Sequence, residues 1–176
     1  IPPIYTLTFY NAIANNGRMM QPRFVKATVK NGDTLTAYPP QVEKGREQIA
    51  SEKTIKIMQD LMHRVVISGT GKKANSPNFW VCGKTGTAMI AKNGSYKGAP
   101  NHLLSFAGWF GEKDKPYYSC IVCIQKQGLP AYGWMSGQVF KDIAEGIMAK
   151  YVRYDISDAR DSTSHPIPDV KNGNIF

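Results

Sequence analysis

The spacing of apolar residues predicts three helices. In each, apolar side chains recur every three or four positions and therefore line one face of a helix. The first predicted helix covers residues 6–16 and ends at Gly17. Ser51 is the expected N-cap of the second, which ends at Gly69, and Ser136 is the expected N-cap of the third. The three helices lie at the beginning, the middle and near the end of the chain.

Short apolar runs bounded by turn residues predict strands between these helices. One run leads directly into Lys84, and two longer, nearly all apolar runs flank a turn and predict a hairpin. A weaker hairpin is predicted around Asn31 and Gly32. The predicted strands are residues 23–29, 35–38, 79–82, 103–110 and 117–125. This order of elements favours an α+β fold, with helices packed on an antiparallel sheet.

Two segments lack any such periodicity. Residues 89–102 contain Gly94, Gly98 and Pro100, which predict a long loop. Residues 155–176 are polar and aperiodic, as linkers are. We therefore expect one folded domain over residues 1–154, followed by a linker.

Composition agrees with one globular domain, because 42% of the 176 residues are hydrophobic. No apolar run approaches the roughly 20 residues that a membrane-spanning helix needs. The net charge of +9 suits acidic polymers, membrane headgroups or nucleic acid. The lysines are scattered along the chain, however, which favours a solvated basic surface and gives no reason to expect a nucleic-acid partner.

The three cysteines predict neither a metal site nor a disulfide. Cys120 and Cys123 have the spacing of a redox or zinc motif, but they lie in a predicted strand. Residues three apart on a strand point to opposite faces. We therefore interpret these two as buried core cysteines.

The string Gly83-Lys84-Thr85 matches the end of the phosphate-binding loop motif, G-x-x-x-x-G-K-S/T. The first glycine of that motif lies five residues before the second. Asn78 occupies that position, and glycines and a proline follow where such a loop needs a helix. A nucleotide site is therefore excluded.

As a strand edge, Lys84 to Thr87 can bind a peptide terminus. Lys84 supplies a positive charge for a carboxylate, and Thr85 and Thr87 supply hydroxyl donors. Gly86 lets a ligand backbone approach closely, and the backbone N–H of Thr87 could stabilise an oxyanion. The same four residues also fit an ordinary hairpin strand with a surface lysine.

An ordered set of segments resembles the transpeptidase domain of class B penicillin-binding proteins, within the superfamily that includes the serine β-lactamases. The resemblance covers about residues 4–152. Within this class, the sequence is similar to the division-specific transpeptidases of Bacteroidetes-type bacteria. The segments that carry the resemblance are residues 6–17, 22–25, 65–66, 69–71, 81–88, 105–110, 116–124 and 139–140. Residues 167–173 resemble the opening of a PASTA module, although an ordinary turn fits them equally well.

The resemblance implies a serine acyl-transfer enzyme that needs no metal or organic cofactor. Its substrate would be the D-Ala-D-Ala end of a peptidoglycan stem peptide, and it would bind β-lactams. Lys84, Thr85, Gly86 and Thr87 would be its substrate-binding residues, with Thr87 as the oxyanion donor. The parent protein would face the periplasm from the inner membrane and could contact division proteins.

The family places its nucleophile in S-x-x-K, and this chain contains no such string. Ser76-Pro77-Asn78 matches the family's S-x-N string but lies too close to Lys84, so we interpret it as a turn. We expect the nucleophile, its helical lobe and further strands to precede Ile1. A sheet without those strands should self-associate or bind the missing part, because it exposes apolar area and an edge.

Three other functions remain open for the same motif. A D,D-carboxypeptidase and a β-lactamase-type hydrolase or receptor share the serine chemistry. A non-catalytic peptide-binding module would use the strand edge alone.

The first prediction follows from the absence of S-x-x-K in this sequence. The 176-residue chain should form no covalent adduct with a fluorescent penicillin, because an acyl-enzyme needs the serine nucleophile. Denaturing gel electrophoresis after incubation measures the adduct, and an intact penicillin-binding protein serves as the positive control. Stoichiometric labelling of the chain would contradict this expectation.

Overall fold

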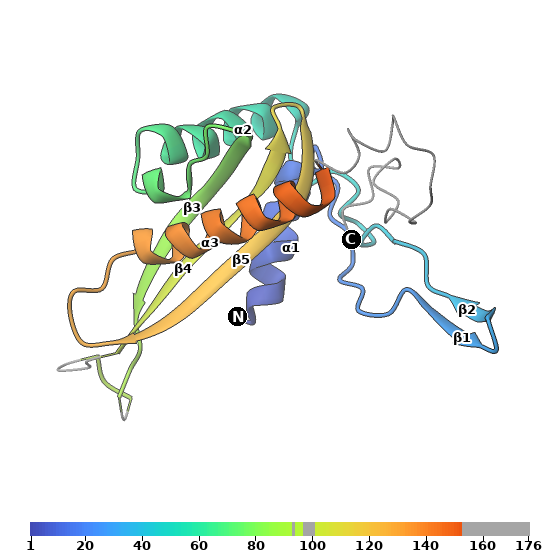
Figure 1. Cartoon of the computed structure of the whole chain (residues 1–176), viewed down its shortest axis with the longest axis horizontal. Coiled ribbons are helices and arrows are strands. Elements are labelled where there is room, and N and C mark those ends of the chain that lie inside the picture. The colour runs from blue at the N-terminus through green and yellow to red at the C-terminus, as the bar shows by residue number, and fades with distance from the viewer. Residues whose placement is uncertain (93, 97–100, 153–176) are drawn as a thin grey trace.

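The computed structural model describes residues 1–92, 94–96 and 101–152. Along the chain, helices alternate with pairs or groups of antiparallel strands (Figure 1). The elements are α1 (Pro3–Ala14), β1 (Ala27–Lys30), β2 (Asp33–Ala37), α2 (Glu52–Ile67), the 3-10 turn η1 (Lys72–Ala74), β3 (Trp80–Met89), β4 (Asn101–Glu112), β5 (Lys115–Gln127), α3 (Trp134–Ile147) and the π-helical turn η2 (Met148–Val152).

The main sheet has the order β3-β4-β5, with both pairs antiparallel. β3 pairs with β4 along its whole length, from Trp80 opposite Gly111 to Met89 opposite His102. Among the described residues, β3 and β5 are the edges of this sheet. The structure confirms the predicted α+β class.

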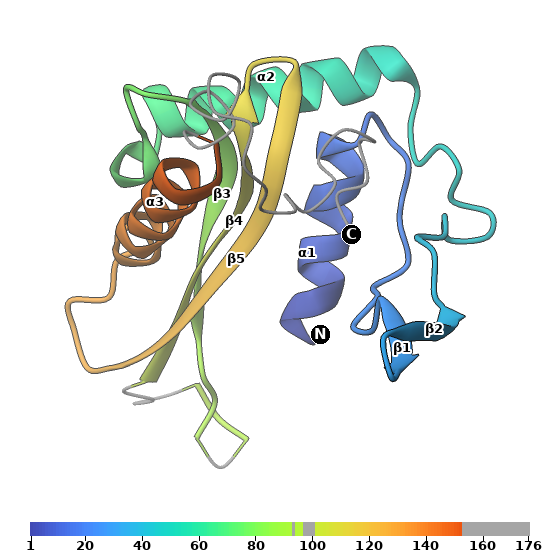
Figure 2. The same cartoon turned by 45° about the vertical axis from the view of Figure 1, so that its right-hand side comes forward.

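One helix covers each face of the sheet, with α1 on one side and α3 on the other (Figure 2). On the α1 side, Asn11 Nδ2 donates a hydrogen bond to Ser119 Oγ of β5 at 3.1 Å. On the α3 side, the Phe140 ring lies 4.7 Å from the ring of Phe106 and 5.8 Å from that of Phe110. These three phenylalanines are fully buried, so this face contains the larger core.

α2 lies beside the first half of β3 and is attached to it by polar contacts. A ring nitrogen of His63 is 2.8 Å from the Val81 carbonyl oxygen, which can only accept the bond. The Cys82 thiol contacts the Gln59 carbonyl oxygen at 3.7 Å. α2 begins as predicted, with the Ser51 side chain accepting a hydrogen bond from the Thr54 N–H.

Two predicted helix boundaries are wrong. α1 begins at Pro3, because proline is favourable in the first turn, where its missing N–H has no partner to lose. α3 begins at Trp134, so Ser136 is not its N-cap. Ser136 is buried, and its hydroxyl donates to the Gly133 carbonyl oxygen at 2.7 Å within the first turn.

The strand boundaries also differ from the prediction. Met89 and His102 pair with each other, so the expected loop over residues 89–102 contains the ends of β3 and β4. The small β1–β2 hairpin is shifted from the expected strands, and it projects from the body with almost every residue exposed (Figure 1). β3 continues through Lys84 and Thr87 as a strand, and β4 is the next helix or strand among the described residues.

The cysteines are less uniform than predicted. Cys82 is buried, Cys120 is half-buried and Cys123 is exposed, so the prediction of a buried core cysteine is wrong for Cys123. Cys120 packs against the core that contains Phe106, whereas Cys123 lies on the opposite face of β5, which α1 covers only in part. The predicted opposite orientation of these two thiols is confirmed.

Within the described residues, none of the helices combines the length and the hydrophobicity that crossing a bilayer requires. The linker expected over residues 155–176, including the segment similar to a PASTA module, lies outside the described part of the chain. The division into a domain and a linker therefore stays a prediction.

The second prediction follows from the close approach of β3 and β4. A Cβ atom on Gly108 would lie 2.8 Å from the Gly83 Cα and would overlap the Cys82 carbonyl oxygen. Gly108→Ala should therefore lower the free energy of unfolding by about 1–3 kcal/mol or more, as overpacking does. Urea denaturation followed by circular dichroism measures the change.

Gly146→Ala is the matched control. Gly146 lies in α3, and beyond its chain neighbours and the backbone of its own helix no atom lies within 4 Å of the position that its Cβ would take. Alanine has the higher helix propensity, so this variant should keep or raise stability by up to ~1 kcal/mol. Equal stability losses in both variants would contradict the steric explanation.

Candidate functional site

The residues Lys84 to Thr87 lie in the second half of β3, at the outer edge of the sheet. β4 pairs with them on one side, from Ala107 opposite Lys84 to Leu104 opposite Thr87. The other side of this segment carries no partner strand among the described residues. The expected strand edge is therefore present, and an edge without a partner strand is the kind to which an extended peptide can add.

Lys84 is exposed, and its ammonium group folds over the next residue. Lys84 Nζ donates to the Thr85 carbonyl oxygen at 2.9 Å and to Thr85 Oγ1 at 3.2 Å. Neither of the two salt bridges found in the described residues includes Lys84. Among the residues that the structure describes, the Lys84 ammonium group therefore has no carboxylate within salt-bridge distance, which leaves its charge available to an anion.

Sequence reasoning missed one residue of this cluster. Thr70, in the Gly69-Thr70-Gly71 turn after α2, places its Oγ1 2.7 Å from Thr85 Oγ1. The sequence assigned this turn only to the end of a helix. The contact joins residues 15 positions apart, so local periodicity could not reveal it, although the hydroxyl between two glycines was a usable signal.

Thr85 and Thr87 share one face of β3, and the turn before α3 packs against both. A Cβ atom on Gly133 would lie 3.0 Å from Thr85 Cβ and 3.2 Å from Thr87 Oγ1. Gly86 belongs to the opposite face, where a Cβ atom would lie 2.5 Å from Ser105 Oγ. Only glycine therefore fits at position 86 without moving Ser105.

Because backbone N–H and C=O groups alternate in direction along an antiparallel strand, those of Thr85 and Thr87 point to the same side of β3. Their hydroxyls also share a face. Lys84, Thr85 and Thr87 together thus concentrate a cation and several hydrogen-bond donors along one short edge, which suits a carboxylate better than a cation or an apolar group.

Ser76-Pro77-Asn78 forms one hydrogen bond to α3 and one within the segment. The Ser76 hydroxyl is buried, donates to Glu145 Oε1 of α3 at 3.4 Å and accepts from the Asn78 N–H at 3.3 Å. The segment is irregular, as the sequence predicted for a turn.

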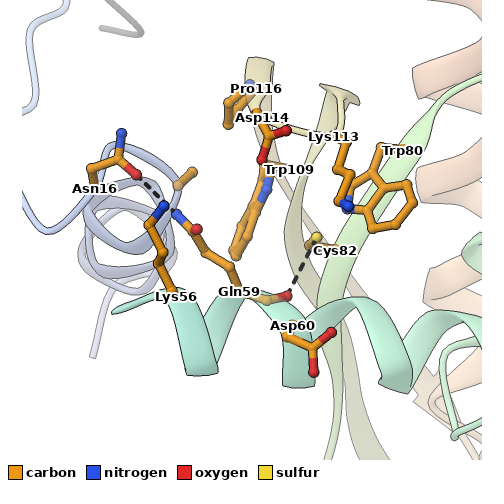
Figure 3. A pocket seen from close by; sticks show the side chains of 11 residues that line it. Asn16, Lys56, Gln59, Asp60, Trp80, Cys82, Trp109, Lys113, Asp114 and Pro116 are labelled. Carbon is orange, nitrogen blue, oxygen red and sulfur yellow. Dashed lines mark hydrogen bonds between the residues drawn. The ribbon is translucent and has the colours of Figure 1, made fainter. Parts of the chain in front are cut away.

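A cavity of about 330 Å³ lies elsewhere, near the start of β3, between α1, α2 and the β4–β5 turn (Figure 3). Trp109 and Cys82 line its buried side, and Gln59 Nε2 donates to Asn16 Oδ1 at 3.3 Å across it. The residues from Lys84 to Thr87 do not line it. Two lysines and two aspartates stand around it, so it has no single preferred charge.

The described residues contain no group of three or more His, Cys, Asp or Glu side chains that could hold a metal ion. The one buried side-chain atom without a partner among them is His102 Nδ1, at the start of β4. A single imidazole is not a metal site.

Residues 1–145 match the family described as the penicillin binding protein transpeptidase domain. The chain therefore belongs to this family. Among curated relatives, it is 31% identical over 149 residues to stage V sporulation protein D of Bacillus subtilis. This alignment covers 84% of this chain and 22% of that protein. It is 28% identical over 154 residues to penicillin-binding protein PbpB of Mycobacterium tuberculosis, in an alignment that covers 80% of this chain and 22% of that protein.

Solved structures agree in fold. The D,D-transpeptidase domain of a peptidoglycan glycosyltransferase from Eggerthella lenta matches with a TM-score of 0.64 and 25% identity, over 83% of this chain and 32% of that one. Penicillin-binding protein 3 of Mycobacterium tuberculosis matches with a TM-score of 0.62 and 25% identity, over 92% and 36%. The chain thus spans about a fifth of the length of these curated relatives and a third of these structures.

The third prediction concerns Cys82, which lies two residues before Lys84. Burial raises the pKa of its thiol to about 12. At pH 8, well below that pKa, the thiol stays protonated and unreactive. Iodoacetamide should therefore modify the exposed Cys123 of the folded chain and spare Cys82, as peptide mass spectrometry would show.

Unfolding in urea is the control, because both thiols should then react at similar rates. Alkylation of Cys82 in the folded chain as fast as that of Cys123 would show that the start of β3 is not packed as described.

Proposed function

We propose that this chain supplies the carboxylate-binding strand of a serine-type peptidoglycan D,D-transpeptidase. The observation that carries the proposal is the cluster of Lys84, Thr85 and Thr87 on the open edge of β3, in a chain that belongs to the transpeptidase family. The serine would lie on polypeptide outside these 176 residues, because they contain no S-x-x-K.

The reaction would proceed in two acyl transfers. The serine oxygen attacks the carbonyl carbon between the two D-alanines, and a tetrahedral oxyanion forms. The C–N bond then breaks, and the terminal D-Ala leaves after its nitrogen gains a proton. The amine of a neighbouring stem peptide next attacks the acyl ester, which makes the cross-link and releases the serine.

The strand edge would bind the substrate by its terminal D-Ala. Lys84 would pair with the α-carboxylate, and the Thr85 hydroxyl would donate a hydrogen bond to it. Gly86 would let the peptide backbone approach β3, and the Thr87 N–H would donate to the oxyanion. β-lactam antibiotics would use the same edge.

The order of the matching segments further supports a class B, division-type enzyme. The complete protein would then be anchored in the inner membrane, with this domain on the periplasmic side. Its partners would include the rest of its own transpeptidase domain, which would cover the free edge of β5, and proteins of the division machinery. Alone, the chain would self-associate through that edge.

The fourth prediction concerns Lys84. N-acetyl-D-alanyl-D-alanine should bind the chain, and its C-terminal amide should bind more weakly, because the amide lacks the charge that Lys84 attracts. Lys84→Gln should weaken binding of the acid roughly tenfold or more, the loss expected for a charged hydrogen bond of about 1.5–3 kcal/mol. Titrations followed by nuclear magnetic resonance measure such weak affinities.

Lys30→Gln is the matched control, since it removes the same charge from an exposed lysine in the separate β1–β2 hairpin. It should leave the affinity for the acid unchanged. Equal losses in the two variants would mean that only net charge matters, and equal affinity of the acid and the amide would refute the proposed site.

A further inference from the structure

Thr85 shares its hydroxyl with two neighbours from different parts of the chain. Thr70 Oγ1 lies 2.7 Å from Thr85 Oγ1, and Lys84 Nζ lies 3.2 Å from the same oxygen. A hydroxyl has one proton to donate and two lone pairs that accept. The direction of the Thr85 proton therefore depends on what these two neighbours do.

The lysine can only donate, so Lys84 occupies one of the two lone pairs of Thr85 Oγ1. The 2.7 Å contact requires one threonine hydroxyl to donate to the other. If Thr85 donates to Thr70, it has no proton left for a ligand. If Thr70 donates, both lone pairs of Thr85 are occupied, and its proton is free to point outward.

The turn that carries Thr70 is held firmly. The Gly69 N–H donates to the Val65 carbonyl oxygen at 3.1 Å, and the Gly71 N–H donates to the same oxygen at 3.0 Å. A Cβ atom on Gly71 would lie 3.2 Å from the Phe106 ring, so the turn packs directly on the core. Thr70 itself is exposed, and water can fill its own lone pairs.

We infer that Thr70 is a positioning residue, whose hydroxyl donates to Thr85 and so directs the Thr85 proton toward a bound carboxylate. The inference rests on the proposed function, and it adds a second chain segment to the binding edge. An anionic ligand selects this arrangement, because a carboxylate accepts hydrogen bonds and cannot donate them. Thr70 acts through Thr85 and contributes to affinity without touching the ligand.

The fifth prediction compares two substitutions of Thr70. Thr70→Val keeps the shape and removes the hydroxyl, and it should weaken binding of N-acetyl-D-alanyl-D-alanine by roughly three- to tenfold, the effect of one hydrogen bond. Thr70→Ser keeps the hydroxyl and should stay within about twofold of the unsubstituted chain. The affinity for the C-terminal amide should change less, so the preference for the acid should fall in Thr70→Val alone.

A double-mutant cycle separates positioning from a general structural effect. In a Thr85→Val background the hydroxyl of Thr70 has nothing to orient, so adding Thr70→Val should cause no further loss of affinity. An additive loss would overturn the inference. Urea midpoints of all variants check folding, and Thr70→Ala provides the same test if Thr70→Val does not fold.

The outcomes separate the two claims. If the unsubstituted chain prefers the acid and Thr70→Val binds it equally well, the inference fails and the proposed function stands. A loss in Thr70→Ser as large as in Thr70→Val also overturns the inference, because the hydroxyl is then not what matters. If the unsubstituted chain shows no preference for the acid, the proposed function fails, and the inference fails with it.

Discussion

The pairing of β3 with β4 is the constraint on which the rest of this structure depends. The two strands meet at Gly83 and Gly108, where neither residue has a side chain to separate them. A Cβ on Gly83 would lie 2.6 Å from atoms of the Phe106 ring, so the ladder and the core are packed against each other. This contact fixes the register of β3 against β4, and the strand order β3-β4-β5 leaves Lys84 at the outer edge.

β3 thereby has a buried half and a more exposed half along its length. Its first half is structural: Val81 and Cys82 are buried, and α2 attaches to their backbone and side chain. In its second half, the cover of α2 ends at the turn that carries Thr70, and Lys84 becomes exposed while Thr85 stays half-buried; this is the half that we propose binds the ligand. The rigid first half positions the exposed second half, as a binding edge requires.

Local sequence patterns were enough to predict the fold class, the strand through Lys84 and the hairpin that follows, because these depend on alternation and turn residues. They failed where a residue's environment depends on distant parts of the chain. Nothing local shows that Met89 pairs with His102, that Cys123 lies on a partly uncovered face, or that Thr70 meets Thr85. Ser136 was misassigned because a buried serine and a capping serine have the same local sequence.

The central claim is that the second half of β3 is the part of this chain that holds a peptide carboxylate. Mapping the backbone amide shifts caused by N-acetyl-D-alanyl-D-alanine tests it most directly. The largest shifts should fall on Lys84 to Thr87 and extend to Thr70. Shifts confined to the residues around the cavity near Trp109 would contradict it.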